Sequence, residues 1–221
     1  MPEPITGLDP AVIRANLERV RAEISASGRD PAEVEILAAV KYLPAEELGA
    51  LAEGGVTLVG ENRAQELERK VAAHPGRFTW DFIGALQSRK VKSILPHVRY
   101  IHSVASDSAL TQLRRHGSPE NEVLVEVNVS GEQGKSGIEP SQLAAFLERS
   151  PVRVVGLMTM PPLTSEPDQS RPYFAQLREL AQRHDLPHLS MGTSQDYLVA
   201  VQEGATIVRL GTTLYRPEGQ F

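Results

Sequence analysis

The 221-residue sequence predicts an α/β fold, namely a single (β/α)8 (TIM) barrel with an extra N-terminal helix. Eight short apolar runs lie along the chain, and each except the last is followed by a stretch with helical character. Repeated strand–helix units favour parallel pairing, because a helical crossover returns the chain in the same direction. No Ser/Gly-rich linker or change in composition divides the chain, so we expect residues 1–221 to form one domain.

The predicted N-terminal helix starts at Asp9-Pro10, which is typical of an N-cap followed by proline at the first helical position. Apolar residues then recur at spacings of four, three and four, at Ile13, Leu17, Val20 and Ile24. Gly28 is suited to ending this helix.

The remaining elements alternate. The predicted strands are Val34–Val40, Thr57–Val59, Trp80–Ile83, Val98–Ile101, Val123–Val129, Val152–Leu157, a weak one at His188–Leu189, and Thr206–Leu210. The predicted helices are Ala45–Ala52, Asn62–Ala73, Ser88–Leu95, Asp107–Arg115, Ser141–Glu148, Arg171–His184 and Gln195–Gln202. Met158–Pro172 contains four prolines and no apolar period, so we expect a long irregular loop there.

An open doubly wound sheet is the alternative architecture. It usually carries a glycine-rich fingerprint after its first strand, and this sequence has none there. Eight units in about 200 residues is the lower size limit of a closed barrel, which we favour.

Composition excludes several classes of function. Lys and Arg total 23 against 28 Asp and Glu, and the net charge of −5 argues against a nucleic-acid-binding protein. Cysteine is absent, which excludes disulfides, thiolate metal sites and a cysteine nucleophile. The start lacks the pattern of a signal peptide, and the apolar runs are far shorter than the ~20 residues of a membrane helix. We therefore expect a cytoplasmic protein that binds neither nucleic acid nor membrane.

Lys41 follows the first predicted strand, where a parallel barrel places its chemistry. Alternation puts Leu37, Ala39 and Lys41 on one face of this strand. Two interpretations stay open: a lysine that extends to water, or a desolvated amine suited to forming a Schiff base with a carbonyl.

Arg209 interrupts the last apolar strand. A buried guanidinium needs a partner, so Arg209 either pairs with a carboxylate, for which Glu126 is one candidate, or faces a ligand.

Two glycine-containing turns form the most specific local pattern. Ser190–Ser194 precedes a predicted helix, and Gly211-Thr212-Thr213 follows the last strand. These positions correspond to the loops after strands seven and eight, where barrels commonly bind phosphate. The six histidines show no metal-ligand spacing, so we expect no metal site.

Seven blocks of residues in order resemble the pyridoxal phosphate homeostasis proteins, whose fold looks like the N-terminal barrel domain of alanine racemase. The blocks are Leu37–Lys41 with Pro44; Gly60-Glu61-Asn62 with Gln65-Glu66; Phe82-Ile83-Gly84 with Leu86-Gln87; Val127–Glu132 with Lys135-Ser136-Gly137; Gly156-Leu157-Met158; Leu189–Gly192 with Ser194 and Asp196; and Val208–Thr212.

The resemblance implies that Lys41 holds pyridoxal 5′-phosphate (PLP) as a Schiff base. It further implies that Ser194, Gly211 and Thr212 bind the phosphate and that Arg209 faces the pyridine nitrogen. Asn62 and Met191 are implied to line the ring pocket. The implied function is PLP homeostasis without efficient amino-acid turnover, with apo forms of PLP-dependent enzymes as recipients and a monomeric state.

Two departures from the family pattern concern Val40, where serine or threonine is common, and Thr193, where methionine is common. Two alternative functions stay open: a PLP-dependent amino-acid racemase, and a cofactor-free Schiff-base lyase of the aldolase type. In the resembling racemases one acid/base tyrosine comes from a domain after the barrel, and this sequence ends at Phe221. We therefore expect no efficient enzyme.

Overall fold

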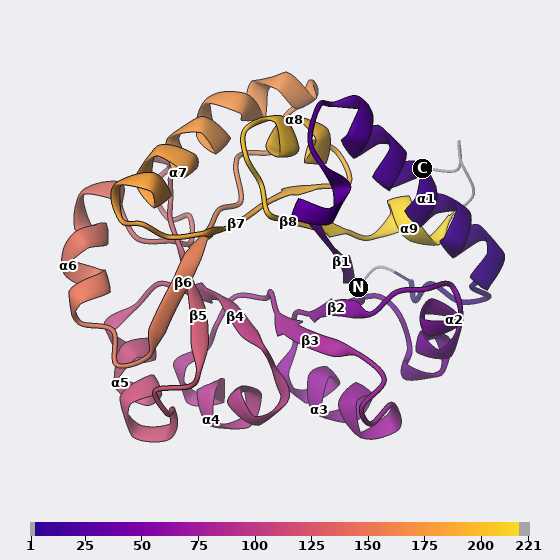
Figure 1. Cartoon of the computed structure of the whole chain (residues 1–221). Helices are drawn as coiled ribbons and strands as arrows, with labels where there is room; N and C mark the ends of the chain where they lie inside the picture. Colours follow the sequence, from indigo (N-terminus) through magenta and orange to yellow (C-terminus); the bar gives the residue numbers. More distant parts are fainter. Residues whose placement is uncertain (1–2, 217–221) are drawn as a thin grey trace.

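A computed structural model describes residues 3–216. These residues form a closed barrel of eight parallel strands, in which the last strand pairs with the first (Figure 1). The strands are β1 (Glu35–Ala39), β2 (Leu58–Glu61), β3 (Thr79–Phe82), β4 (Tyr100–Val104), β5 (Glu122–Glu126), β6 (Arg153–Met158), β7 (His188–Thr193) and β8 (Ile207–Leu210). The predicted (β/α)8 barrel is confirmed.

Helices form a ring outside the strands (Figure 1). They are α1 (Pro10–Ala26), α2 (Leu48–Glu53), α3 (Ala64–Ala73), α4 (Val91–Ile94), α5 (Asp107–His116), α6 (Leu143–Glu148), α7 (Arg171–Arg183), α8 (Tyr197–Gln202) and α9 (Thr212–Tyr215). Short 3-10 segments cover Pro31–Glu33, Ala45–Glu47, Ser88–Lys90, Leu95–His97, Pro140–Gln142 and Pro167–Ser170. The sequence did not predict α9, because four residues are too few to show an apolar repeat.

The extra helix α1 begins and ends as predicted. The Asp9 carboxylate caps it by accepting a backbone N–H at 2.8 Å, and Gly28 follows it with φ +89° in the left-handed region. The four apolar residues of the predicted stripe are all buried. The Asn16 side-chain amide also donates to the carbonyls of Leu214 at 3.2 Å and Arg216 at 2.9 Å. These bonds tie α1 to the segment that follows β8.

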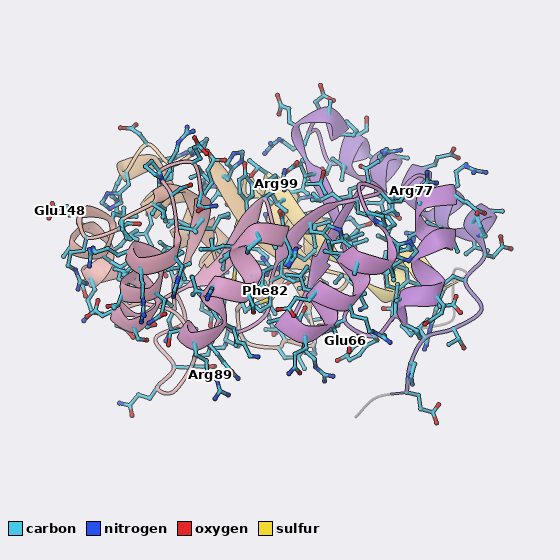
Figure 2. All side chains as sticks on the ribbon, turned by 90° about the horizontal axis from the view of Figure 1, so that it is seen from below. Glu66, Arg77, Phe82, Arg89, Arg99 and Glu148 are labelled. Atoms are coloured by element: carbon cyan, nitrogen blue, oxygen red, sulfur yellow. The ribbon has the colours of Figure 1, made fainter. Side chains whose placement is uncertain are left out.

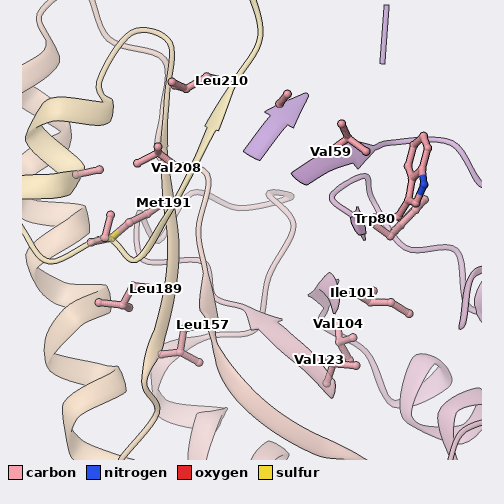
Figure 3. Close-up of a cluster of buried hydrophobic side chains, with 14 of the residues drawn as sticks. Val59, Trp80, Ile101, Val104, Val123, Leu157, Leu189, Met191, Val208 and Leu210 are labelled. Carbon is pink, nitrogen blue, oxygen red and sulfur yellow. The ribbon is translucent and has the colours of Figure 1, made fainter. Parts of the chain in front are cut away.

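The core has two layers, because alternate side chains of each strand point to opposite faces of the sheet. The outer layer packs between strands and helices and includes Val59, Trp80, Ile101, Val123, Leu189 and Val208 (Figure 3). The smaller inner cluster contains Leu37, Leu58, Tyr100, Leu124, Val155, Met158 and Ile207. Polar side chains occupy much of the remaining interior, including the fully buried Asp81, His102 and Ser190.

With the 3-10 segments counted as helical, four segments differ from the sequence prediction by three residues or more. β4 runs from Tyr100 to Val104 and not from Val98 to Ile101. β5 ends at Glu126 and not at Val129, although Val127 still bridges to Ile138. β7 is not confined to its first two residues but extends to Thr193, so most of the predicted turn Ser190–Ser194 is strand. The predicted loop at residues 158–172 is irregular only at residues 159–166, because a 3-10 segment and α7 follow.

The two ends of the barrel carry different residues. Figure 2 shows Arg77 and Arg99, which precede strands, toward one end, and Glu66 and Arg89, which follow strands, toward the other. Within residues 3–216, no helix is long and apolar enough to cross a membrane.

Candidate functional site

A cavity of about 390 Å³ opens at the carboxyl ends of the strands. It is lined by Ile5, Ala39, Lys41, Tyr42, Asn62, Ile83, Met160, Thr193, Ser194, Gln195, Arg209, Gly211, Thr212 and Tyr215. Six of the seven predicted site residues therefore meet here: Lys41, Asn62, Ser194, Arg209, Gly211 and Thr212. The volume lies within the range of small-molecule sites, about 300–1,000 Å³.

Lys41 lies two residues beyond β1, in a turn and not within the strand. The turn is closed by the Leu43 N–H, which donates to the Val40 carbonyl at 3.0 Å. The Lys41 side chain is exposed, and its Nζ lies 4.8 Å from the centroid of the Tyr42 ring. An accessible primary amine therefore stands at the cavity above the small side chain of Ala39.

Asn62 directly follows β2 and presents an unpartnered acceptor. Its Oδ1 atom is buried, and no hydrogen-bond donor reaches it among residues 3–216. Gly84, which follows β3, packs directly against the Asn62 backbone. Only glycine fits there, because a Cβ at that position would lie 2.1 Å from the Asn62 carbonyl oxygen. A buried acceptor without a donor is costly unless a ligand or water supplies one.

Arg209 is 6% exposed, and its guanidinium donates to neutral acceptors. It reaches the Ser190 carbonyl at 2.7 Å, the Ser190 hydroxyl at 2.6 Å and the Thr159 carbonyl at 2.9 Å. Glu126, one candidate partner, forms no ion pair with it in the described part of the chain. Burial lowers the pKa of Arg209 to about 10, against the opposing effects of Asp196 and Glu126. Arg209 is thus a cation at neutral pH, and no carboxylate among residues 3–216 pairs with it directly.

A chain of hydrogen bonds continues from Arg209 through the barrel. Because the Ser190 hydroxyl accepts from Arg209, its own proton is directed to Nδ1 of His102 at 2.9 Å. His102 Nε2 then donates to Asp81 Oδ2 at 3.1 Å, which assigns the neutral Nε2–H tautomer from the bonding pattern. Asp81 also accepts two bonds from Arg99, at 3.1 and 2.7 Å.

The charges along this chain follow from burial. Burial lowers the pKa of His102 and outweighs the hydrogen bond and charge of Asp81, so the imidazole is neutral. Burial alone would raise the pKa of Asp81, but the bonds from His102 and Arg99 lower it overall, so the carboxylate is ionised. Three consecutive donors, Arg209, Ser190 and His102, therefore point from the cavity toward one buried anion.

The loops after β7 and β8 meet beside Lys41. The Asp196 carboxylate accepts from the Thr193 N–H at 2.7 Å and from its hydroxyl at 3.1 Å, which fixes the first loop. The Gly211 N–H donates to the Ser194 hydroxyl at 3.3 Å, which links the two loops. A Cβ at Gly211 would meet no atom within 4 Å, so its backbone faces open space.

The structure differs from the prediction at Met191, which does not line the cavity. Its side chain is fully buried in the outer layer of the core with Leu189 and Val208 (Figure 3). The physical reason is strand alternation, since Ser190 points into the barrel and the next residue therefore points out.

Eight of the fourteen lining residues were not predicted, and three of them bear on the chemistry of the site. Ile83 and Met160 are apolar residues at strand ends, and nothing in their spacing separates them from core residues. Tyr215 lies on the four-residue helix α9, and its hydroxyl donates to the Ala39 carbonyl at 3.0 Å. Burial raises the pKa of Tyr215, and Glu61 adds to this effect. Within residues 3–216, no group of His, Asp or Glu side chains could hold a metal ion.

The arrangement combines an accessible amine, a fixed cation and two backbone loops around one cavity. It is suited to a ligand that carries a carbonyl group, a polar ring and an anionic group.

Comparisons with known proteins agree with this description. A family model described as the N-terminal domain of alanine racemase matches residues 8–218. A protein of Aquifex aeolicus named pyridoxal phosphate homeostasis protein is 40% identical over 213 residues, covering 90% of this chain and 93% of that protein. A protein of the same name from Pseudomonas aeruginosa is 39% identical over 207 residues, covering 89% and 90%.

Solved structures give the same fold. PipY of Synechococcus elongatus, solved with PLP bound, matches with a TM-score of 0.78 and 30% identity over 92% of this chain and 100% of PipY. Alanine racemase from Corynebacterium glutamicum matches with a TM-score of 0.72 over 97% of this chain and 63% of the racemase. Its identity is 14%, so this second likeness concerns the fold alone.

Proposed function

The chain belongs to the pyridoxal phosphate homeostasis proteins, within the alanine racemase N-terminal domain family, and from this membership we propose that it binds PLP in the cavity and serves PLP homeostasis. The observation that carries the proposal is the meeting of Lys41, Arg209 and the loops after β7 and β8 around one cavity.

The residues present fit PLP group by group. When bound, PLP supplies an aldehyde that forms a Schiff base with a primary amine and releases water. Lys41 is the one lysine at this cavity within the described chain and supplies that amine. The unpartnered Asn62 Oδ1 provides an acceptor for a hydroxyl on the ring.

Arg209 donates toward the ring nitrogen, and its pKa of about 10 keeps it protonated at neutral pH. The backbone N–H groups of Ser194, Gly211 and Thr212 bind the phosphate, because fixed N–H groups are suited to a dianion. The hydroxyls of Ser194 and Thr212 add to this site. Met191 does not belong to the proposed PLP-binding residues, because its side chain packs in the core.

We further propose that the protein is not an efficient amino-acid enzyme. Racemisation needs two positioned acid/base groups on opposite faces of the substrate. Tyr215 is the buried tyrosine at the cavity, and its hydroxyl already donates to Ala39 while its pKa is raised. We also propose that residues 1–221 act as one monomeric domain and that apo forms of PLP-dependent enzymes receive the cofactor.

The test combines trapping with turnover. Borohydride reduction of PLP-loaded protein, followed by peptide mass mapping, should place the label on Lys41, and Lys41→Ala should lose it while staying folded. A label on another lysine, or none, contradicts the proposal. Incubation with L-alanine and other L-amino acids should give no racemisation, decarboxylation or transamination near 1–10³ per second, the ordinary range of enzymes. Turnover in that range would favour the racemase alternative.

A further inference from the structure

A lysine lies where a hydrophobic residue is expected. Helix α3 turns Ala64, Leu67 and Lys70 toward the barrel, and Lys70 is only 1% exposed. Lysine is almost never fully buried unless its ammonium group is paired, because removing the charge from water is costly.

The Lys70 ammonium has two buried acceptors. Its Nζ lies 2.5 Å from Glu61 Oε2, and the Glu61 side chain is fully buried at the end of β2. It also donates to the Val40 carbonyl at 2.7 Å. That carbonyl belongs to the peptide group that joins Val40 to Lys41, and it also accepts the Leu43 N–H that closes the turn around Lys41.

The other oxygen of the same carboxylate holds a second cavity residue. Glu61 Oε1 accepts from the Asn62 N–H at 2.6 Å and from the Arg63 N–H at 3.0 Å. One buried ion pair therefore fixes the main chain beside Lys41 on one side and beside Asn62 on the other.

Stability alone does not account for this arrangement. Replacing a buried ion pair with hydrophobic residues of similar volume is often neutral or stabilising. One end of this pair bonds to the carbonyl that precedes Lys41, and the other end accepts the N–H of Asn62. Planar peptide groups pass such a constraint directly to the next residue.

We propose that Glu61 and Lys70 are positioning residues that set the direction of the Lys41 side chain, so that its amine meets the carbonyl carbon of a ligand held by the phosphate loops. The inference rests on the proposed PLP function and extends it. Neither residue touches the ligand; Lys70 acts through the Val40 carbonyl, and Glu61 acts by orienting Lys70.

The test separates positioning of Lys41 from general support of the cavity. Affinity is measured for PLP and for 4′-deoxypyridoxine 5′-phosphate, which carries a methyl group in place of the aldehyde and needs no lysine. The main variant is Glu61→Gln/Lys70→Met. It removes the donor to Val40 without leaving an unpaired charge, and the introduced amide oxygen can still accept the Asn62 N–H.

Lys70→Met and Glu61→Gln are measured alone, and Lys92→Met, at an exposed position on α4, is the matched control. We expect the double variant to lose about tenfold in affinity for PLP, the lower end of the effect of removing a supporting contact at a metal site. Its affinity for the deoxy analogue should change less than about threefold, and Lys92→Met should change neither. Borohydride labelling of Lys41 should slow in parallel with the loss of PLP affinity.

A folded double variant whose PLP-to-analogue affinity ratio equals that of the wild type overturns the inference, whether both affinities are unchanged or both fall by the same factor. If the wild type shows no label on Lys41, the proposed function fails and the inference fails with it. If the wild type is labelled and the ratio is unchanged in the variants, only the inference fails.

Discussion

The hydrogen-bond chain behind Arg209 gives a quantitative prediction for His102→Gln. His102 is fully buried, and its pKa is lowered from the ordinary value of 6.5, mainly by burial. The unfolded chain therefore binds a proton below pH 6.5 that the folded protein does not bind. Such a group reduces stability as the pH falls below its unfolded pKa.

The magnitude follows from linkage. A group that stays unprotonated in the folded state lowers the free energy of unfolding by about 1.4 kcal/mol per pH unit below 6.5. Between pH 6.5 and 5.0 the wild type should lose up to about 2 kcal/mol through His102. His102→Gln keeps a neutral donor for Asp81 and removes the titration, so this part of the slope should disappear.

At pH 7.5 the variant should be less stable by about 1–2 kcal/mol, because the Ser190 hydroxyl loses its acceptor. The gap to the wild type should then narrow as the pH falls toward 5.0. Burial also lowers the pKa of His188 and raises that of Glu126, but both residues are present in both proteins, so their effects cancel in the comparison. The lowered pKa of Asp81 acts at more acidic pH.

The assay is urea unfolding of the ligand-free protein, followed by circular dichroism from pH 5.0 to 7.5. Ser190→Ala is the matched control, since it breaks the same hydrogen bond but leaves His102 buried and should keep the wild-type slope. Equal slopes in the wild type and His102→Gln would refute the reasoning. A proton on Nδ1 of His102 in ¹⁵N-resolved NMR would refute the assigned tautomer.

Two further predictions concern the cavity. Thr212→Ala should weaken PLP binding by about 1–3 kcal/mol in equilibrium titration, because a charge-assisted hydrogen bond is lost. Pyridoxal, which lacks the phosphate, should bind the wild type far more weakly than PLP. Equal affinities for pyridoxal and PLP would contradict the phosphate site. Gly84→Ala should lower stability by about 1–3 kcal/mol and weaken PLP binding, because the new Cβ would lie 2.1 Å from the Asn62 carbonyl oxygen. Gly49→Ala, in open space on α2, should instead be neutral or stabilising by up to about 1 kcal/mol in the same unfolding assay.

Sequence reasoning located those site residues that break an apolar strand or follow its end. Lys41 and Arg209 stand out because a charge next to buried strand residues needs an explanation, and the barrel rule then places both at one end. Met191 came from the resemblance alone. Strand alternation, applied from Ser190 onward, would have placed its side chain outside the barrel.

Lys70 could not be identified in the same way. A lysine near the end of a polar helix usually lies in water, and the sequence around it contains enough Glu and Arg to suggest a solvated face. Its burial depends on how α3 packs against β2, which is a tertiary property. Tyr215 was not predicted as a site residue for a related reason, since its contact with Ala39 joins positions 176 residues apart.

The site residues lie where the first and last strands of the barrel meet. Lys41 and Asn62 follow β1 and β2, whereas Ser194, Arg209 and Gly211 lie on or after β7 and β8, and β8 pairs with β1 where the barrel closes. Tyr215 and α1 bind across the same closure, through the bonds to Ala39 and from Asn16.

A ligand held by Lys41 on one side and by the phosphate loops on the other would span this closure as well. Binding would then stabilise the closed barrel through mass action, because the unfolded chain has no such pair of loops. The opposite half of the barrel, β3 to β6, contributes the buried Asp81, His102 and Glu126. Of these, Glu126 raises the pKa of Arg209 against the effect of burial. One half of the barrel thus supplies the groups arranged to bind, and the other half supplies buried polar groups behind the cation that the ligand meets.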